Sequence, residues 1–337
     1  MRVTPHAKAV AEIAASICAE RPIHRYSDYL RRRYGEKTYR VSVDAGFTCP
    51  VRDHSRPCTY CDPRGSRAPY LGAENDLREQ IVGARDYLER RYGARRFLLY
   101  FQAFSSTYAP VDELRRIYDL GLACGEFAGL VVSTRPDCLD EQRAALLAEY
   151  AGRGIDVWLE LGLQSAHDRT LRRVRRGHSA AEFDRAARLA REAGLLIAAH
   201  LIVGLPGEGR AEVVETVRHL STLGVDAVKF HNLVITRGTM LYRLFREGRA
   251  SALSGGDYMR MLIEALENLP PETIVMRLTC DPPRDVDTVP AHLPEKAAFN
   301  RQLVEEMRSQ DVWQGKRWTQ AHAHMYHSEG TPNADKG

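Results

Sequence analysis

The sequence predicts an α/β fold, an open partial barrel of six β/α units, and two observations support that prediction. Short apolar runs alternate with longer amphipathic runs between about residues 39 and 235. Alternation of this kind is typical of a parallel sheet with helical crossovers. The units recur roughly every 30 residues, and six units suit an open barrel better than a closed barrel of eight strands.

Six segments have the short, apolar, β-branched or aromatic-rich composition that is typical of strands. They are residues 38–44, 96–102, 129–134, 156–163, 195–203 and 226–234. The helices predicted between them are residues 76–92, 111–125, 139–152, 179–193 and 210–223. Ser179 and Glu182 form a capping-box pattern at one helix start, and Gly93 and Gly194 follow two helix ends.

The barrel is expected to occupy residues 39–238. An N-terminal helical extension precedes it over residues 1–38, and a helix-rich C-terminal extension follows over residues 239–318. The proline-rich segment 281–294 is predicted to interrupt that extension as a loop. The polar residues 319–337 are predicted to form a disordered tail. The histidines of this tail are expected to be solvated, and they are His322, His324 and His327.

The composition is that of an ordinary soluble globular protein, with 44% hydrophobic and 27% charged residues among 337. No apolar run approaches the roughly 20 residues that a membrane span needs, and the first residues lack the pattern of a signal peptide. We therefore expect a cytoplasmic protein without a membrane partner. Seven cysteines, an odd number and unevenly spaced, do not form a disulfide scaffold.

Three of the cysteines fall within thirteen positions, as Cys49, Cys58 and Cys61 in the pattern C-x8-C-x2-C. Structural zinc sites take four ligands, usually in two pairs. Here the nearest fourth ligand is His54, which lies inside the loop. A [4Fe–4S] cluster held by three thiolates keeps one iron open for a substrate or cofactor. The pattern therefore favours a catalytic iron–sulfur cluster, with zinc as the alternative.

Polar residues follow five of the predicted strands, at the ends where barrels of this kind carry their chemistry. They are the cysteine loop, residues 102–108, residues 133–137, Glu160 with Gln164, and His200 with the turn 204–207. We expect Arg135 and Asp137 to form a loop-stabilising ion pair, with a direct catalytic role as the alternative. The turn 204–207 is expected to shape the barrel mouth, because no lysine follows it as in a phosphate-binding loop.

Seven stretches, in order over about 250 residues, together resemble the radical S-adenosylmethionine (SAM) superfamily. Within it they resemble bacterial YhcC-type proteins, which are related to the catalytic subunit of Elongator. The stretches are VSVDAGFTCPVRD (41–53), CTYC (58–61), LLYFQAFSSTYAP (98–110), VVSTRPDCL (131–139), WLELGLQSAHDRTLRRVRRGH (158–178), HLIVGLPGE (200–208) and MRLTCDPPR (276–284). The resemblance implies a partial (β/α)6 TIM-like barrel of the radical SAM type.

The cofactors that this resemblance implies are one [4Fe–4S] cluster, with Cys49, Cys58 and Cys61 as ligands, and SAM. The superfamily's usual spacing is C-x3-C-x2-C, and here the first gap is eight residues. Tyr60 matches an aromatic position near the SAM adenine. Gln102 and Ser105 lie in the loop whose backbone binds the SAM amino group in many relatives, although the glycines usual there are absent.

Four further positions match SAM contacts of the superfamily. Ser133 follows the third strand, and Gln164 and Arg176 form a pair in which the arginine meets the SAM carboxylate. Arg175 is the alternative if the register slips by one residue. His200 lies where relatives have an acidic residue that faces the ribose.

Glu160 lies inside an apolar strand, where an acid is costly to bury unless it is paired. Two interpretations stay open at this stage. Either Glu160 faces the cavity and binds substrate or SAM, or it forms a buried pair with one of the nearby arginines.

The activity implied by the resemblance is reductive cleavage of SAM to methionine and a 5′-deoxyadenosyl radical. The electron would come from an external reductant of the flavodoxin or ferredoxin type. The same resemblance favours RNA as substrate, most plausibly a tRNA wobble uridine. Two basic clusters, Arg31–Arg33 with Lys37 and Arg169–Arg176, are expected to flank the barrel mouth. Contact with RNA phosphates is one interpretation of them, and ordinary solvated helix faces are the other.

Two other functions remain open from the sequence. One is a radical SAM reaction on a small molecule, such as a porphyrin-type oxidation. The other is a zinc-stabilised nucleic-acid-binding module without catalysis.

Overall fold

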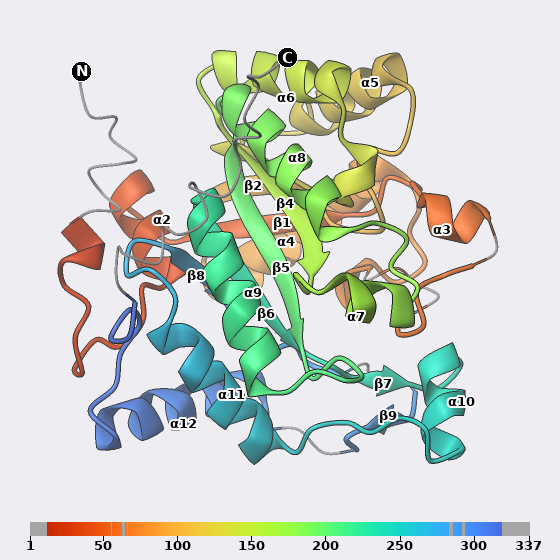
Figure 1. Cartoon of the computed structure of the whole chain (residues 1–337). Helices are drawn as coiled ribbons and strands as arrows, with labels where there is room; N and C mark the ends of the chain where they lie inside the picture. Colours follow the sequence, from red (N-terminus) through yellow and green to blue (C-terminus); the bar gives the residue numbers. More distant parts are fainter. Residues whose placement is uncertain are drawn as a thin grey trace, which may run out of the picture.

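A computed structural model describes residues 12–54, 56–62, 65, 67–282, 286–291 and 294–318 (Figure 1). The predicted tail, with His322, His324 and His327, lies outside these residues. Within the described residues, no helix is both long enough and apolar enough to cross a bilayer.

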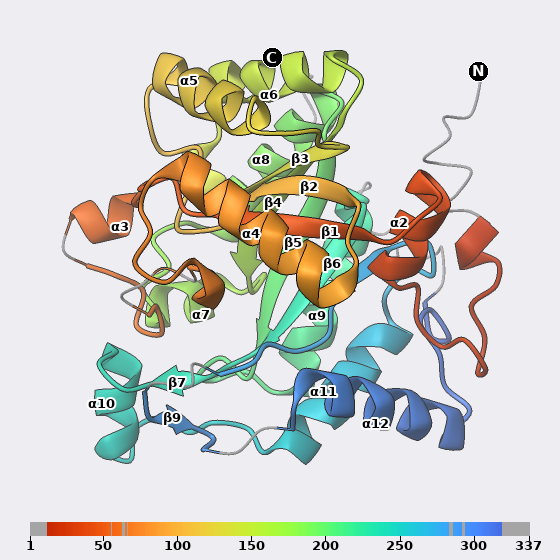
Figure 2. The same ribbon diagram turned by 180° about the vertical axis from the view of Figure 1, so that it is seen from behind.

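The core of the fold is one sheet whose seven strands are all parallel and follow the order β1-β2-β3-β4-β5-β6-β8 (Figures 1 and 2). The strands are β1 (Thr38–Val43), β2 (Arg96–Phe101), β3 (Gly129–Thr134), β4 (Asp156–Gln164), β5 (Leu196–Val203), β6 (Ala227–Asn232) and β8 (Ile274–Arg277). The six predicted strands are confirmed within two residues at each end. β8, inside the predicted C-terminal extension, adds a seventh strand beside β6.

The helices on the outer face of the sheet include all five that the sequence predicts, as α4 (Leu77–Tyr92), α5 (Val111–Leu122), α6 (Glu141–Gly152), α8 (Ala180–Glu192) and α9 (Arg210–Leu223). The remaining helices are α2 (Tyr26–Tyr34), α3 (Pro50–Asp53), α7 (Asp168–Arg173), α10 (Met240–Arg246), α11 (Gly255–Glu267) and α12 (Lys296–Ser309). A short antiparallel pair joins β7 (Ile235–Thr236) to β9 (Thr288–Val289). The predicted capping box of α8 forms between Ser179 and Glu182.

Residues of each strand alternate between two separate cores, because successive side chains of a strand point to opposite faces. In β4, Leu159 and Leu161 belong to the large core under the helices. Trp158 belongs to a smaller core on the inner face of the sheet, together with Tyr26 and Tyr29 of α2. Both tyrosine rings meet the indole edge-on, with centroids 5.7 and 5.8 Å away. The helix α2 therefore packs into the barrel from the inner face.

The arginines of α2 lie at the N-terminal edge of the sheet, and not at the mouth. Arg33 makes a two-pronged ion pair with Asp156, the first residue of β4, at 3.0 and 2.7 Å. Arg32 pairs with Glu12, and Lys37 directly precedes β1. The prediction that this cluster flanks the barrel mouth is therefore wrong. The cluster precedes the start of a strand, whereas the mouth is formed by the strand ends.

We predict that Trp158→Ala lowers the free energy of unfolding by about 3–5 kcal/mol, the usual cost of removing a fully buried aromatic side chain. The control Val82→Ala, at a half-exposed position on α4, is expected to change it by at most about 0.5 kcal/mol. Chemical denaturation of both variants measures this. Equal effects at the two positions would contradict the assignment of Trp158 to the inner core.

Candidate active site

The three clustered cysteines lie on the loop that follows β1. Cys49 is the N-cap of α3, and its carbonyl oxygen accepts the amides of Arg52 and Asp53 at 3.0 and 3.1 Å. Cys58 and Cys61 share one turn, in which the Cys61 amide donates to the Cys58 carbonyl oxygen at 3.1 Å. Cys49 and Cys58 are buried and Cys61 is half-buried.

Two distant segments hold this turn through the backbone of Thr59. The Thr59 amide donates to the carbonyl oxygen of Val174, which follows α7, at 2.9 Å. The Thr59 carbonyl oxygen accepts the amide of Leu241 in α10 at 2.8 Å. Both partner side chains are almost fully buried. The turn that carries Cys58 is thus fixed between the segments that follow β4 and β7.

The loop after β2 braces the other part of the cysteine loop. The Ser105 amide donates to the carbonyl oxygen of Thr48 at 3.2 Å, and the Phe104 amide donates to that of Gly65 at 3.1 Å. Ser105 is fully buried, and Gln102 is half-buried with its amide on β1. The residues predicted to lie near the SAM amino group therefore adjoin the cysteine loop. The backbone amides of Phe104 and Ser105 are bonded to carbonyl oxygens of that loop.

Two guanidinium groups lie against two of the thiols. Arg52 donates to the sulfur of Cys61 at 3.1 Å, and Arg176 lies 3.8 Å from the sulfur of Cys58. Burial raises the pKa of the Cys61 thiol, and the adjacent Arg52 opposes this effect. A nearby cation favours the thiolate, which is the form that binds metal.

The donor set of this loop fits an iron–sulfur cluster. Three soft sulfur donors come from one loop, and His54, the fourth zinc ligand considered from the sequence, is exposed. Among the described residues no three histidine, cysteine, aspartate or glutamate side chains are gathered around the position of a single ion. A cubane takes each thiolate on a different iron, so its ligands stand farther apart than those of one ion.

The side chains of Arg176 and Gln164 lie against the Cα of Gly162 on β4. A Cβ at Gly162 would come within 2.4 Å of the Arg176 Nη2 and 2.7 Å of the Gln164 Nε2. Arg176 donates to the Gly162 carbonyl oxygen at 3.0 Å, whereas Arg175 is exposed and has a positive φ of 57°. Arg176 is therefore the arginine of this segment that lies half-buried beside Gly162 and Cys58, and its contact with SAM stays a prediction.

His178 orients Arg176, and sequence reasoning did not single it out. Arg176 Nε donates to His178 Nε2 at 2.9 Å, and His178 Nδ1 lies 3.1 Å from the carbonyl oxygen of Ser179. Burial and the adjacent Arg176 lower the pKa of His178 to about 3, so the ring is neutral. The only feature of the sequence that pointed to this role of His178 was its position two residues after Arg176.

The other residues predicted to contact SAM are Tyr60 in the cysteine turn and Ser133 and His200 on β3 and β5. Tyr60 packs against a small apolar cluster, and its buried hydroxyl has no hydrogen-bond partner among the described residues. Burial raises the pKa of Tyr60, and Arg176 opposes this effect. Ser133 accepts the Ser106 amide through its carbonyl oxygen at 2.9 Å. His200 stands beside Gly162 in the register of β4 and β5.

Glu160 is fully buried on the inner face of the sheet and binds groups from four other strands. Its Oε1 accepts from Arg40 of β1 at 2.8 Å. Its Oε2 accepts from Tyr100 of β2 at 2.6 Å and from Lys229 of β6 at 2.5 Å, and it lies 2.9 Å from His200 Nε2. Burial alone would raise the pKa of Glu160, but Lys229 and Arg40 hold it well below its usual value.

The buried pairing, one of the two interpretations left open for Glu160, forms, but its arginine partner is Arg40 of β1 and not an arginine close to it in the sequence. Because Glu160 occupies His200 Nε2, any contact of His200 with SAM would use Nδ1. The expected pair of Arg135 and Asp137 also forms, with two bonds of 2.9 and 2.8 Å. Residues 204–207 form the expected turn, with positive φ at both glycines.

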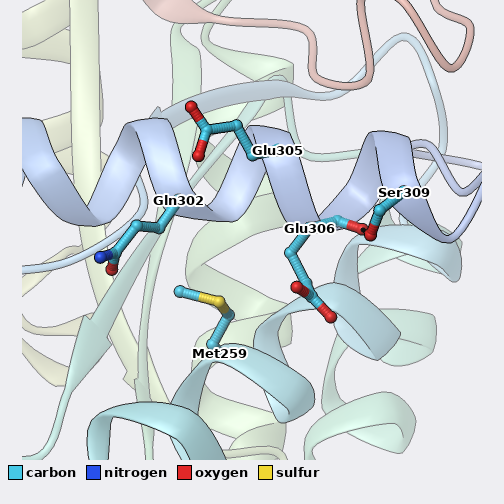
Figure 3. A pocket seen from close by; sticks show the side chains of 5 residues that line it. All are labelled: Met259, Gln302, Glu305, Glu306 and Ser309. Carbon is cyan, nitrogen blue, oxygen red and sulfur yellow. Dashed lines mark hydrogen bonds between the residues drawn. The ribbon is translucent and has the colours of Figure 1, made fainter.

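A separate pocket of about 410 Å³ lies between α11 and α12, away from these residues (Figure 3). Its lining side chains are Met259, Gln302, Glu305, Glu306 and Ser309. None of the residues predicted for the active site contributes to it.

Comparison with known families identifies the class of protein. Residues 46–220 match the Radical SAM superfamily, and residues 225–308 match the Radical_SAM C-terminal domain. The chain therefore belongs to the radical SAM superfamily, whose members use a [4Fe–4S] cluster and SAM.

Two relatives confirm the similarity to the YhcC type. Protein YhcC of Escherichia coli (strain K12) is 39% identical over 260 residues, which are 76% of this chain and 83% of that protein. The protein YtqA of Bacillus subtilis (strain 168) is 32% identical over 300 residues, 88% of this chain and 93% of that protein.

More distant similarity extends to Elongator. Elongator complex protein 3 of Homo sapiens is 29% identical over 159 residues, 46% of this chain and 28% of that protein. The solved structure of the archaeal Methanocaldococcus infernus Elp3 aligns with a TM-score of 0.61 at 19% identity, over 87% of this chain and 68% of that one. This structural match confirms the partial-barrel fold.

We predict that Glu160→Gln lowers the free energy of unfolding by about 3–5 kcal/mol, because it leaves buried cations without their counter-charge. The further change Lys229→Met is expected to recover part of that loss. Glu247→Gln, in an exposed pair with Arg249, serves as the control and should cost less than about 1 kcal/mol. Denaturation curves measure all three. A loss no larger at Glu160 than at Glu247 would contradict the buried network.

Proposed function

We propose that this chain cleaves SAM reductively at a [4Fe–4S] cluster held by Cys49, Cys58 and Cys61. The observation that supports this most is the anchored loop itself, which presents three thiols at the C-terminal edge of the sheet with an arginine against two of them. When bound, the cluster supplies the electron that cleaves SAM to methionine and a 5′-deoxyadenosyl radical. An external flavodoxin- or ferredoxin-type protein is the proposed reductant.

Arg176 is the proposed partner of the SAM carboxylate. A guanidinium has five N–H donors, and the bonds of Arg176 to His178, to the Cys58 sulfur and to the Gly162 carbonyl oxygen involve three of them. One N–H remains on each terminal nitrogen, which suits a two-pronged bond to a carboxylate. The neutral His178 and the bare Gly162 keep the guanidinium in that position.

The remaining SAM contacts that we propose come from the same strand ends. Tyr60, with its unpartnered hydroxyl, lies near the adenine, and His200 faces the ribose through Nδ1. The other proposed contacts are Gln102, Ser105, Ser133 and Gln164.

For the substrate we propose RNA, specifically a tRNA with a wobble uridine as target. Arg172 and Arg175 follow β4, and Arg243 and Arg246 lie on α10; both segments flank the cysteine turn. All four are exposed, and within the described part of the chain none forms an ion pair. Unpaired arginines around an active-site mouth suit a polyanionic partner.

We predict that the anaerobically reconstituted chain binds about four iron atoms and releases 5′-deoxyadenosine when SAM and dithionite are added. Cys58→Ser is expected to lose most of its iron and to reduce the release to background, because one cluster ligand is removed. Cys124→Ser, two residues after the end of α5 and outside the loop, is the matched control and should retain both. Iron analysis and chromatography of the nucleoside provide the readouts. Uptake of one zinc ion and no iron would refute the proposal.

We predict that Arg172→Gln with Arg175→Gln weakens tRNA binding and reduces the magnitude of the salt slope by about 2, roughly one for each lost phosphate contact. The control is Arg90→Gln with Arg91→Gln, which removes the same charge from the exposed end of α4. Binding at several salt concentrations measures the slopes. If both double variants behave alike, the arginines at the mouth do not contact RNA, and a small-molecule substrate gains support.

A further inference from the structure

The inner face of β6 and β8 carries two cations side by side. Lys229 of β6 stands opposite Arg277 of β8 in the strand register. Directly opposite residues of neighbouring strands point to the same face. Lys229 reaches Glu160 and the hydroxyl of Tyr100 inside the barrel. The register shifts between Val228 and Lys229, but the charge of Arg277 lowers the pKa of both Lys229 and His231. Arg277 therefore lies near these inward-facing groups.

Positive charge exceeds negative charge on this face. Among the described residues, Glu160 is the carboxylate that pairs with Arg40 and Lys229, and Arg277 lies opposite Lys229 in the strand register. Burial lowers the pKa of Lys229, an effect that Glu160 opposes. If Lys229 is charged the excess is two, and if it is neutral Arg40 and Arg277 still outnumber the carboxylate. The next carboxylate along the chain, Asp281, is exposed.

The guanidinium of Arg277 has neither a hydrogen bond nor an ion pair to any described residue, although Arg277 is half-buried. Both oxygens of Glu160 are already used, one by Arg40 and the other by Tyr100, Lys229 and His200. A half-buried guanidinium without a partner is costly. An anionic ligand would supply the missing partner.

His231 adds a second unsatisfied group beside Arg277. Its Nε2 is buried and has no hydrogen-bond partner among the described residues. Its ring lies 5.3 Å from that of His200, with an angle of 32° between the planes. Burial, followed by the charge of Arg277, keeps the pKa of His231 well below its usual value. The neutral ring can donate one N–H to a ligand oxygen.

The position of these groups suits a ligand that meets the cluster and SAM. Arg277 is the last residue of β8, and His231 is the second-last residue of β6. Both therefore lie at the C-terminal edge of the sheet, as the cysteine loop does. The proposed SAM contacts Ser133 and Gln164 lie on other strands, β3 and β4. Both are half-buried, so solvent reaches them.

We propose that Arg277, with His231 and Lys229, forms a subsite for an anionic group, a carboxylate or a phosphate, of the molecule on which this active site acts. The assignment of the anion to the substrate rests on the proposed function. Anion binding itself requires neither the cluster nor SAM cleavage. Failure of the anion to bind would therefore not contradict SAM cleavage, and failure to cleave SAM would not contradict anion binding.

Calorimetric titration of the full chain with inorganic phosphate and, separately, with succinate tests this subsite, at ionic strength held constant with chloride. We expect one of the two probes to bind, which identifies the group as phosphate or carboxylate. Arg277→Gln is expected to weaken that binding at least about tenfold. Arg90→Gln, which removes one exposed arginine from the end of α4, is the matched control and should bind as the wild type does.

Arg277→Lys, which keeps the charge but loses the planar fork, is a second variant and should retain part of the affinity. It replaces Arg277→Gln if that variant does not show a cooperative unfolding transition. Failure of both probes to bind the wild type would overturn the proposal, as would equal affinity of the Arg277 variants and the wild type. Competition between the bound probe and SAM would also overturn it, because the anion would then be the SAM carboxylate.

Discussion

The interaction on which the site depends is the pair of backbone hydrogen bonds made by Thr59. They fix the turn of Cys58 and Cys61 between the segment that ends at Val174 and the helix α10. A loop that must hold three sulfurs at separate corners of a cluster loses conformational freedom, and backbone bonds to buried neighbours offset that cost. The eight residues between Cys49 and Cys58 do not leave Cys58 free to move, because hydrogen bonds to neighbouring segments fix its turn.

A buried polar layer connects five strands across the barrel. Glu160 joins Arg40, Tyr100, Lys229 and His200, and every one of them projects from a different strand. Removing one member leaves buried charge uncompensated, so the layer stabilises one arrangement of the strands. The same layer leaves the Arg277 guanidinium without a partner among the described residues, and the proposed anion subsite rests on this.

The sequence predicted what local periodicity and spacing determine. Strand and helix bounds, the Ser179 cap and the Arg135–Asp137 pair follow from nearby residues, and the cysteine spacing pointed to a cluster. Long-range pairing could not be predicted. Two of the partners of Glu160, Arg40 and Lys229, lie 120 and 69 residues away along the chain, and β8 is only four residues long. The cluster of Arg33 was wrongly predicted to flank the barrel mouth, because closeness to a strand in the sequence does not show at which edge of the sheet a side chain lies.

The central claim is that three thiolates leave one iron of the cluster open and that SAM occupies it. Mössbauer spectroscopy of the anaerobically reconstituted chain, with ⁵⁷Fe and with or without SAM, tests it most directly. The spectrum is expected to show a four-iron cluster in which one iron changes its parameters when SAM is added. An iron-free protein, or a cluster whose irons all keep their parameters in the presence of SAM, would contradict the claim.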